Sequence, residues 1–238
     1  MSRRFFVEPH IDSPQAVLHG PEAHHLAHVL RAKAGDEVVL FDGSGQEFAA
    51  RVSKIGRDRI ELDVLETRAV DRELPFRLTL AVALPKGDRQ AWLVEKAVEL
   101  GVSELIPLVT TRGVAQPVDK ALERLRRGVI EASKQCGRNR LMGVAQPQSW
   151  SELIGAERSG QRYVAHPGGQ AASLLSAPAR PGASGQWSLA IGPEGGLTDE
   201  EVALALAAGW QTIGLGSRIL RVETAAMALA AWLALGSA

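Results

Sequence analysis

Residues 191–198 read Ile-Gly-Pro-Glu-Gly-Gly-Leu-Thr, and this stretch decides the fold that the sequence predicts. The apolar run before it predicts a strand that breaks into a Gly/Pro loop, and Thr198 followed by Glu201 predicts the capping box of a helix. Residues 214–225, Gly-Leu-Gly-Ser-Arg-Ile-Leu-Arg-Val-Glu-Thr-Ala, repeat the plan of strand, loop and helix. Two glycine-rich loops at the ends of neighbouring strands are typical of α/β proteins that hold a small ligand by its backbone.

Strand and helix patterns alternate from residue 75 to residue 238. Strands are predicted at 76–84, 104–109, 162–165, 187–191 and 210–215, and helices at 88–100, 119–136, 198–209 and 222–235. Asp88 is expected to cap the first of these helices. Such alternation predicts a mostly parallel sheet that is covered on both faces. The fold class is therefore α/β, with a C-terminal α/β domain over residues 75–238.

Residues 1–70 have short strands and tight turns instead. Strands are predicted at 37–41, 47–52 and 59–65, with a turn at 42–45 and one short helix between Pro21 and Arg31. Short strands around one helix predict a small β-barrel over residues 1–70. The polar stretch 67–75, which ends in Pro75, is the expected linker between the two domains.

The composition limits the functions that this chain can have. Lys and Arg number 27 and Asp and Glu number 27, so the net charge of zero argues against a binder that relies on a basic tail. Its one cysteine, Cys136, excludes an internal disulfide framework. No apolar signal segment follows the N-terminal arginines, and the most apolar run, 225–235, is too short to span a bilayer. We therefore expect a cytoplasmic protein without a membrane partner.

The two glycine loops differ in what they can bind. The first, 192–196, suits a ligand that approaches the backbone closely, although a plain strand-to-helix turn is the alternative, and it matches neither the Walker A pattern nor Gly-x-Gly-x-x-Gly. The second contains three aliphatic residues, Leu215, Ile219 and Leu220. An apolar slot beside exposed backbone groups suits an adenine ring, with Arg218 and Arg221 at its mouth. Glu223 lies at the start of the last helix, where the helix dipole favours a carboxylate. The alternative to a functional role is a local Arg221–Glu223 ion pair that only orders the loop.

Histidines and cations are the remaining candidates for binding. His24 and His28 have the i, i+4 spacing of a helical metal pair, but only Glu22 is near in sequence, so a solvated or RNA-facing helix is favoured and no metal is predicted. Six cations lie between residues 122 and 140 against two acids: Arg124, Arg126, Arg127, Lys134, Arg138 and Arg140. Such a run is either a solvated helix face or, as we expect here, a patch that binds phosphates.

Several motifs along the whole chain match the sequence motifs of one family. They are Arg4-Phe5-Phe6, His25 with Val29-Leu30-Arg31, Leu40-Phe41-Asp42-Gly43, Leu84-Pro85-Lys86-Gly87-Asp88, residues 95–102, residues 131–138 and the two C-terminal loops. In these motifs the chain closely resembles the RsmE family of bacterial 16S ribosomal RNA methyltransferases, within the SPOUT superfamily.

The resemblance implies a fold, a cofactor and a reaction. The α/β domain would be of the SPOUT type with a deep trefoil knot, and the N-terminal barrel would be PUA-like and would help to hold RNA. A homodimer would use S-adenosyl-L-methionine to methylate N3 of one uridine in 16S rRNA of the small ribosomal subunit. The implied cofactor contacts are His166, Gly192, Pro193, Glu194, Gly195, Gly196, Leu215, Gly216, Ser217, Ile219, Leu220 and Thr224. The implied RNA contacts are Arg4, His25, Arg31, Lys86, Arg124, Arg127, Lys134, Arg138 and Arg140.

That reaction places demands on the catalytic residues. Uridine N3 carries a proton, so the site needs a base, or cations that stabilise the uracil anion. We expect Arg138 and Arg221 to stabilise the anion or its adjacent phosphate, and Glu194 or Glu223 to take the proton or else to anchor a loop.

Three other functions stay open on the sequence alone. A non-catalytic RNA-binding ribosome assembly factor could keep the same fold, although the intact cofactor loops argue against it. An α/β enzyme that binds a nucleotide phosphate is disfavoured because the Gly-Lys-Ser/Thr signature is missing. A SPOUT methyltransferase that acts on tRNA or on a ribose 2′-OH is the main enzymatic alternative.

Overall fold

The computed structural model describes residues 4–113, 119–157, 159–171 and 185–235. The chain divides into two compact units. Unit 1 comprises residues 1–73 and 130–141, and unit 2 comprises residues 74–129 and 142–238. The end of helix α3 (Asp119–Cys136) and the residues directly after it therefore pack with the N-terminal part of the chain.

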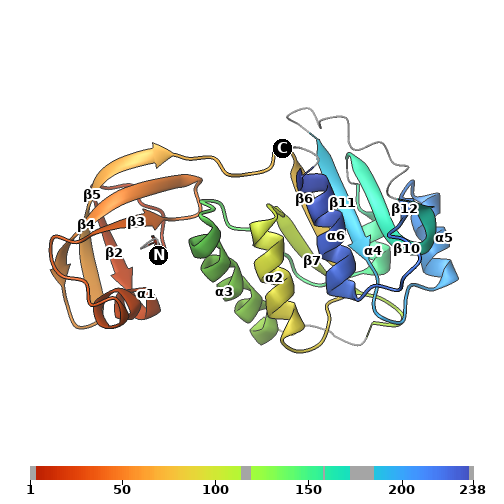
Figure 1. Ribbon diagram of the computed structural model, residues 1–238, viewed down its shortest axis with the longest axis horizontal. Coiled ribbons are helices and arrows are strands. Elements are labelled where there is room, and N and C mark those ends of the chain that lie inside the picture. The colour runs from red at the N-terminus through yellow and green to blue at the C-terminus, as the bar shows by residue number, and fades with distance from the viewer. Residues whose placement is uncertain (1–3, 114–118, 158, 172–184, 236–238) are drawn as a thin grey trace. The chain divides into compact units, whose positions relative to one another are not determined.

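Unit 1 is built on a five-stranded sheet in the order β1-β3-β4-β5-β2 (Figure 1). Its strands are β1 (Arg4–Phe6), β2 (Gln15–His19), β3 (Glu37–Phe41), β4 (Gln46–Ile55) and β5 (Arg59–Ala69). β1 runs parallel to β3, and the other neighbours are antiparallel. The three predicted strands are confirmed, whereas β1 and β2 were not predicted. Within the described residues β1 and β2 are the two edges, so the sheet is not closed by a ladder between them.

The predicted short helix of unit 1 is present in two parts. Helix α1 (Gly20–His24) continues into a π-helical turn (His25–Val29). Side chains from this turn and from the sheet share one core, which includes Phe5, Leu18, Leu26, Leu40, Phe48, Ile60 and Leu62. Burial alternates along β2 and at the start of β5, as expected for a sheet with one face against the core.

Asp42 fixes the predicted turn between β3 and β4. Its side chain is 2% exposed, and its carboxylate accepts backbone hydrogen bonds from Ile11 at 2.9 Å and Ser44 at 3.0 Å. Burial by itself raises the pKa of Asp42, but the hydrogen bonds from Ser44 and Ile11 and the nearby His10 outweigh it. The pKa therefore lies below its ordinary value of 3.8.

Replacing Asp42 with alanine is expected to lower the free energy of unfolding of unit 1 at neutral pH. The expected loss is about 1–3 kcal/mol, because two partly buried hydrogen bonds lose their charged acceptor. Since the folded-state pKa is lowered, this contribution is present above pH 3.8 and is lost as the pH falls through the folded-state value below it. Denaturant unfolding at a series of pH values measures the difference, with the exposed Asp58→Ala as control. A loss that stays constant down to strongly acidic pH would contradict this account.

Unit 2 contains a parallel sheet in the order β12-β10-β11-β6-β7-β8, and β9 also pairs with β7. The strands are β6 (Arg77–Val82), β7 (Glu104–Val109), β8 (Gly143–Val144), β9 (Gln148–Ser149), β10 (Gln161–Ala171), β11 (Gln186–Ile191) and β12 (Gln211–Gly214). Every strand pair in the described part of this unit is parallel. β6 and β11 are buried almost continuously, as is typical of strands covered on both faces. The predicted α/β class is therefore confirmed.

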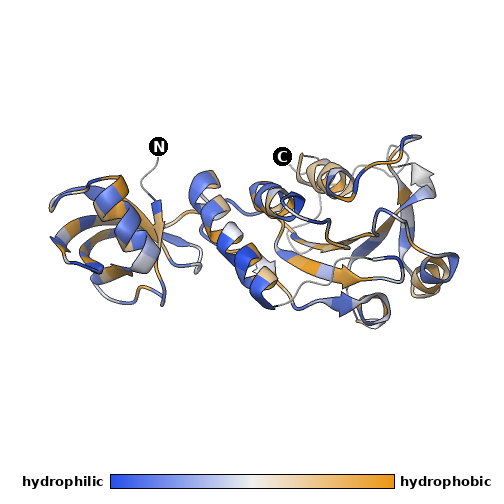
Figure 2. Ribbon diagram, turned by 90° about the horizontal axis from the view of Figure 1, so that it is seen from below, coloured by the Kyte–Doolittle hydropathy of each residue, from blue (hydrophilic) through white to orange (hydrophobic). Residues whose placement is uncertain are grey.

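Helices cover both faces of this sheet (Figure 2). α2 (Arg89–Glu99) and α6 (Val222–Leu235) lie on one face, and α4 (Trp150–Gly155) and α5 (Asp199–Ala207) lie on the other. The capping box of Thr198 and Glu201 is confirmed. The predicted cap by Asp88 is wrong, because its backbone is already helical (φ −65°, ψ −19°) and its side chain makes no cap hydrogen bond. No helix in the described part of the chain is long and apolar enough to cross a membrane.

Candidate functional site

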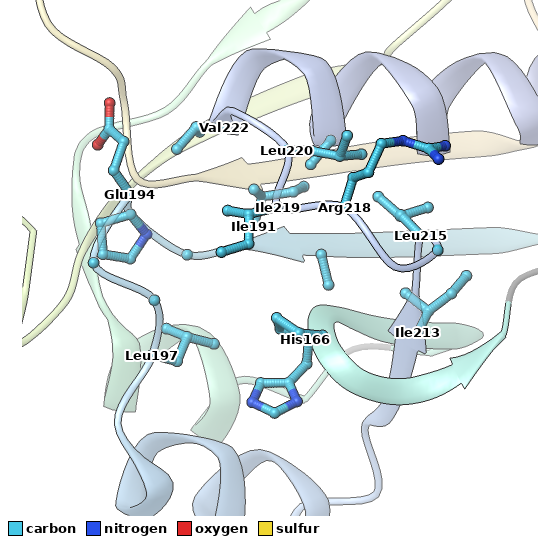
Figure 3. Close-up of a pocket in the computed structure, with 18 residues that line it drawn as sticks. His166, Ile191, Glu194, Leu197, Ile213, Leu215, Arg218, Ile219, Leu220 and Val222 are labelled. Atoms are coloured by element: carbon cyan, nitrogen blue, oxygen red, sulfur yellow. The ribbon is translucent and has the colours of Figure 1, made fainter.

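A pocket of about 360 Å³ lies at the carboxyl ends of β10, β11 and β12 in unit 2 (Figure 3). The segments that follow these three strands form its lining. Much of its wall is aliphatic: Ile191, Leu197, Ile213, Leu215, Ile219, Leu220 and Val222. Open α/β sheets bind ligands at this end of their strands.

The loop at His166 is a bulge within β10. Ala165 and Gln170 both take the register position opposite Ile213, so residues 166–169 leave the ladder. The backbone of Gly169 packs directly on β12, where a Cβ atom would lie 2.7 Å from the backbone of Ile213. The bulge brings His166 to the side of the pocket opposite Leu220 (Figure 3). Only glycine fits this approach of one strand to the next.

The first glycine loop is a tight turn that is held from outside. Gly196 has a φ of +72°, and its N–H donates to the carbonyl of Pro193 at 2.8 Å. A Cβ on Gly192 would lie 2.8 Å from the side chain of Leu197. Arg112, which follows β7, donates from Nη1 to the carbonyl of Gly195 at 3.0 Å. Arg112 was not predicted, because a lone exposed arginine after a strand carries no sequence signal.

Most of the predicted cofactor contacts lie together in this pocket. The lining includes His166, Gly192, Pro193, Glu194, Gly195, Gly196, Leu215, Gly216, Ile219 and Leu220. Ser217 and Thr224 are exposed and do not belong to the lining. Arg218 lines the pocket, whereas Arg221 is exposed beyond it.

The two predicted glutamates face a common arginine. Nη2 of Arg89, the first residue of α2, lies 3.4 Å from Oε1 of Glu194, and its Nη1 lies 3.4 Å from Oε1 of Glu223. Glu194 lines the pocket, and Glu223 lies in the first turn of α6. The structure does not show the expected alternative of an Arg221–Glu223 pair, since within the described residues Glu223 forms its ion pair with Arg89. Arg89 was missed because its two partners, Glu194 and Glu223, lie on other elements that are distant in sequence.

Arg138 does not belong to this pocket. It lies in unit 1, its side chain is 4% exposed, and Nε donates to Oε1 of Glu73 at 3.0 Å. A second contact joins Nη2 to Oε2 of the same carboxylate. A buried guanidinium that binds one carboxylate through two contacts stabilises unit 1. The expected roles of Arg138 in stabilising a uracil anion and in binding RNA stay predictions, and the structure shows its guanidinium paired with Glu73.

Two other predicted RNA contacts in unit 1 are also neutralised. Nη1 of Arg4, which is buried, lies 2.9 Å from Glu47. Nζ of Lys134 lies 2.8 Å from Glu22 and 3.0 Å from Glu131. Burial alone would lower the pKa of Lys134, but the hydrogen bonds to the two glutamates raise it. The predicted basic patch is therefore partly a set of internal ion pairs.

The remaining predicted RNA contacts are accessible. Arg31, Lys86, Arg124, Arg127 and Arg140 are exposed. The His25 ring lies 5.9 Å from that of Phe5 in the π-helical turn, and Arg31 just after it has a φ of +52°. π-helical turns and left-handed non-glycine residues cluster at functional sites. His24 and His28 have ring centroids 4.8 Å apart, and no group of metal-ligand side chains completes a site among the described residues.

Comparisons with known proteins show the family of this chain. Residues 72–234 match a family described as RNA methyltransferase domain, and residues 18–65 match one described as RNA methyltransferase PUA domain. A relative from Synechocystis sp., named Ribosomal RNA small subunit methyltransferase E, is 36% identical over 94% of this chain and 75% of its own length.

Two solved structures extend the likeness to the three-dimensional fold. A Ribosomal RNA small subunit methyltransferase E from Neisseria gonorrhoeae, bound to S-adenosyl methionine, has a TM-score of 0.86 and 31% identity, and the match covers 97% of this chain and 96% of that one. A Legionella pneumophila protein, solved in complex with the bound cofactor SAM, has a TM-score of 0.88 and 30% identity, with 98% and 97% covered. By its sequence and its fold, this chain belongs to the ribosomal RNA small subunit methyltransferase E family.

Proposed function

We propose that this protein transfers a methyl group from S-adenosyl-L-methionine to N3 of one uridine in the 16S rRNA of the small ribosomal subunit. The observation that carries the proposal is the aliphatic pocket at the ends of three parallel strands, built from glycine loops. Relatives matched over most of the chain are named for methylation of small-subunit rRNA, and two solved structures with the same fold hold the cofactor.

The residues of the pocket fit that cofactor. Aliphatic side chains such as Leu215 and Leu220 suit an adenine ring, and the exposed backbone of the glycine loops offers donors and acceptors for its edge. Gly169 and Gly192 allow close packing around the pocket, because a Cβ atom would clash with the backbone of Ile213 at the first position and with the side chain of Leu197 at the second. The volume lies within the range of about 300–1,000 Å³ that small-molecule sites occupy.

The chain itself has to manage the proton of the target base. When bound, the cofactor supplies a reactive methyl on a sulfonium, so the protein mainly positions the base and excludes water. Uridine N3 must lose its proton before it can accept the methyl group. Glu194, whose side chain is 49% exposed at the edge of the pocket, is our candidate acceptor. Glu223, only 9% exposed, is the candidate anchor.

RNA contacts are proposed where basic side chains are at least partly exposed in each unit. In unit 1 these are His25, Arg31 and Arg140, and in unit 2 they are Lys86, Arg124 and Arg127. Arg221, exposed just before α6, is proposed to meet the phosphate beside the target base. Phosphate contacts by such side chains position RNA without reading its sequence.

Knotting, dimerisation and location are proposed with the function. A trefoil knot is supported by the return of α6 from the edge strand β12 to pack against β6 and β11 in the middle of the sheet. Exposed apolar residues of unit 2, among them Trp92 of α2, support a homodimer. A ribosomal substrate supports a cytoplasmic location.

Cofactor binding is the experiment that tests the proposed function. We expect isothermal titration with S-adenosyl-L-methionine to show binding, and Gly195→Trp to weaken it at least about tenfold, a loss of about 1.4 kcal/mol, because the indole would crowd the Arg112 side chain and displace the loop that lines the pocket. Gly155→Trp, at the end of α4 where a Cβ meets nothing within 4 Å, is the matched control. Transfer of labelled methyl groups to unmethylated 30S subunits then identifies the product nucleotide. A folded protein that does not bind the cofactor would point instead to a non-catalytic assembly factor.

A further inference from the structure

Three charged side chains from three elements meet at the edge of the pocket. Glu223 is nearly buried with a side chain 9% exposed, Arg89 is 38% exposed, and Glu194 is 49% exposed. The exposure rises from the helix α6 through α2 to the loop after β11. Figure 3 shows the Glu194 side chain at the edge of the pocket, where it points away from Leu197 and His166.

The position of Arg89 is not explained by the stability of its own helix. Arg89 is the first residue of α2, and a cation there opposes the helix dipole. The helix has no acidic residue in its first turn, and Asp88 gives it no side-chain cap. Exposed ion pairs of this length contribute little to stability. The role of Arg89 therefore lies in its contacts with Glu194 and Glu223.

Both carboxylates depend on Arg89. Oε2 of Glu223 is buried and has no hydrogen-bond partner in the described part of the chain, while Oε1 has only the contact to Arg89 at 3.4 Å. Burying a carboxylate costs free energy unless a cation pairs with it, and Arg89 is the cation that reaches both Glu223 and Glu194. Glu223 thus holds Nη1 of Arg89 in place, which leaves Nη2 directed at Glu194.

We propose that Arg89 is a positioning residue for the methyl transfer, anchored by the buried Glu223 and holding the Glu194 carboxylate at the edge of the pocket as the acceptor of the uridine proton. The proton passes from N3 to a Glu194 oxygen, the electron pair stays on the uracil ring, and the glutamic acid later releases the proton to water. This role rests on the proposed function, since only a protonated target atom needs such an acceptor. Arg89 acts through Glu194 and does not itself touch the reacting atoms.

The test measures single-turnover methylation of unmethylated 30S subunits, together with cofactor affinity and RNA affinity. We expect Glu194→Gln to slow the reaction about 100-fold, the lower end of the usual contribution of acid–base catalysis. Arg89→Gln should slow it about tenfold and Arg89→Lys should restore most of the rate, while both affinities stay within about threefold of wild type, a change under 1 kcal/mol. Arg77→Gln, which removes the same charge at the opposite end of β6, is the matched control.

A double variant makes the test specific to the proposed chain of contacts. If Arg89 acts through Glu194, then adding Arg89→Gln to Glu194→Gln should cause no further loss of rate. An equal loss in both backgrounds, or full turnover by Glu194→Gln, would overturn the role of Arg89 while wild-type methylation keeps the proposed function. A folded wild-type protein that neither binds the cofactor nor methylates 30S subunits would overturn the proposed function itself, and this role with it.

Discussion

Replacing Gly169 with alanine is expected to remove most of the affinity of the protein for S-adenosyl-L-methionine. The new Cβ would lie 2.7 Å from the backbone nitrogen and carbonyl carbon of Ile213 and 2.9 Å from the nitrogen of Gly214. These are backbone atoms of β12, so no side-chain rotation can relieve the clash. The bulge of β10 must move away from β12, and His166 and Leu215 move apart with these two strands.

The size of this effect follows from the cost of overpacking. Forcing an extra carbon into a packed site costs about 1–3 kcal/mol, which corresponds to a loss of affinity of up to about 100-fold. Isothermal titration measures the affinity, and thermal unfolding shows whether unit 2 is still folded.

The neighbouring glycine offers a matched control for the same experiment. A Cβ on Gly168 would meet only the His166 ring, at 3.4 Å and 3.5 Å, and these are ordinary contacts. Gly168→Ala should therefore bind the cofactor within about threefold of wild type, a difference below 1 kcal/mol. If the two variants bind equally well, the bulge does not shape the cofactor site.

The parts of the fold that the sequence predicted well are those with a local signal. Periodic apolar runs gave β7 and α6 with the bounds found in the structure, and the Thr198 capping box was found from its spacing alone. Helix α4 was missed although Ser149 and Glu152 form the same kind of box, because it has only six residues and shows no periodic run. The strands β8 and β9, each of two residues, are too short for any pattern to appear.

The pocket was predictable for the same reason, and its charged edge was not. Glycine loops at strand ends are written in consecutive residues, so their meeting at one end of a parallel sheet follows from topology. Arg89 and Arg112 reach the loop of Glu194 and Gly195 from two other strand ends. The spacing of residues in the sequence does not predict these contacts, because they depend on which strands become neighbours in the sheet.

The basic run before residue 140 shows what the spacing of cations leaves out. Cations at helical spacing are a fair signal for an RNA-binding face, but the sequence does not say which carboxylates lie opposite. Glu22 and Glu73, far away in sequence, pair with Lys134 and Arg138 in unit 1. The positive charges of Lys134 and Arg138 are therefore paired with carboxylates inside unit 1.

Arg138 therefore gives a second large expected effect, on stability. Replacing it with leucine leaves the carboxylate of Glu73, 19% exposed, without the guanidinium that binds it in two places. Breaking one partner of a buried ion pair typically lowers the free energy of unfolding by about 3–5 kcal/mol, because a charge is left uncompensated. Urea unfolding followed by a signal from unit 1 measures this loss.

Two further variants separate packing from an RNA role. Arg140→Leu, which removes an exposed cation two residues later, should change stability by no more than about 0.5 kcal/mol. Arg138→Leu combined with Glu73→Leu should recover part of the loss, since apolar residues in place of both partners leave no unpaired charge. Cofactor affinity should stay unchanged throughout, because the pocket lies in unit 2. An Arg138→Leu protein that unfolds like wild type but no longer binds rRNA would return Arg138 to the RNA-binding surface, since only a guanidinium free of Glu73 could act there.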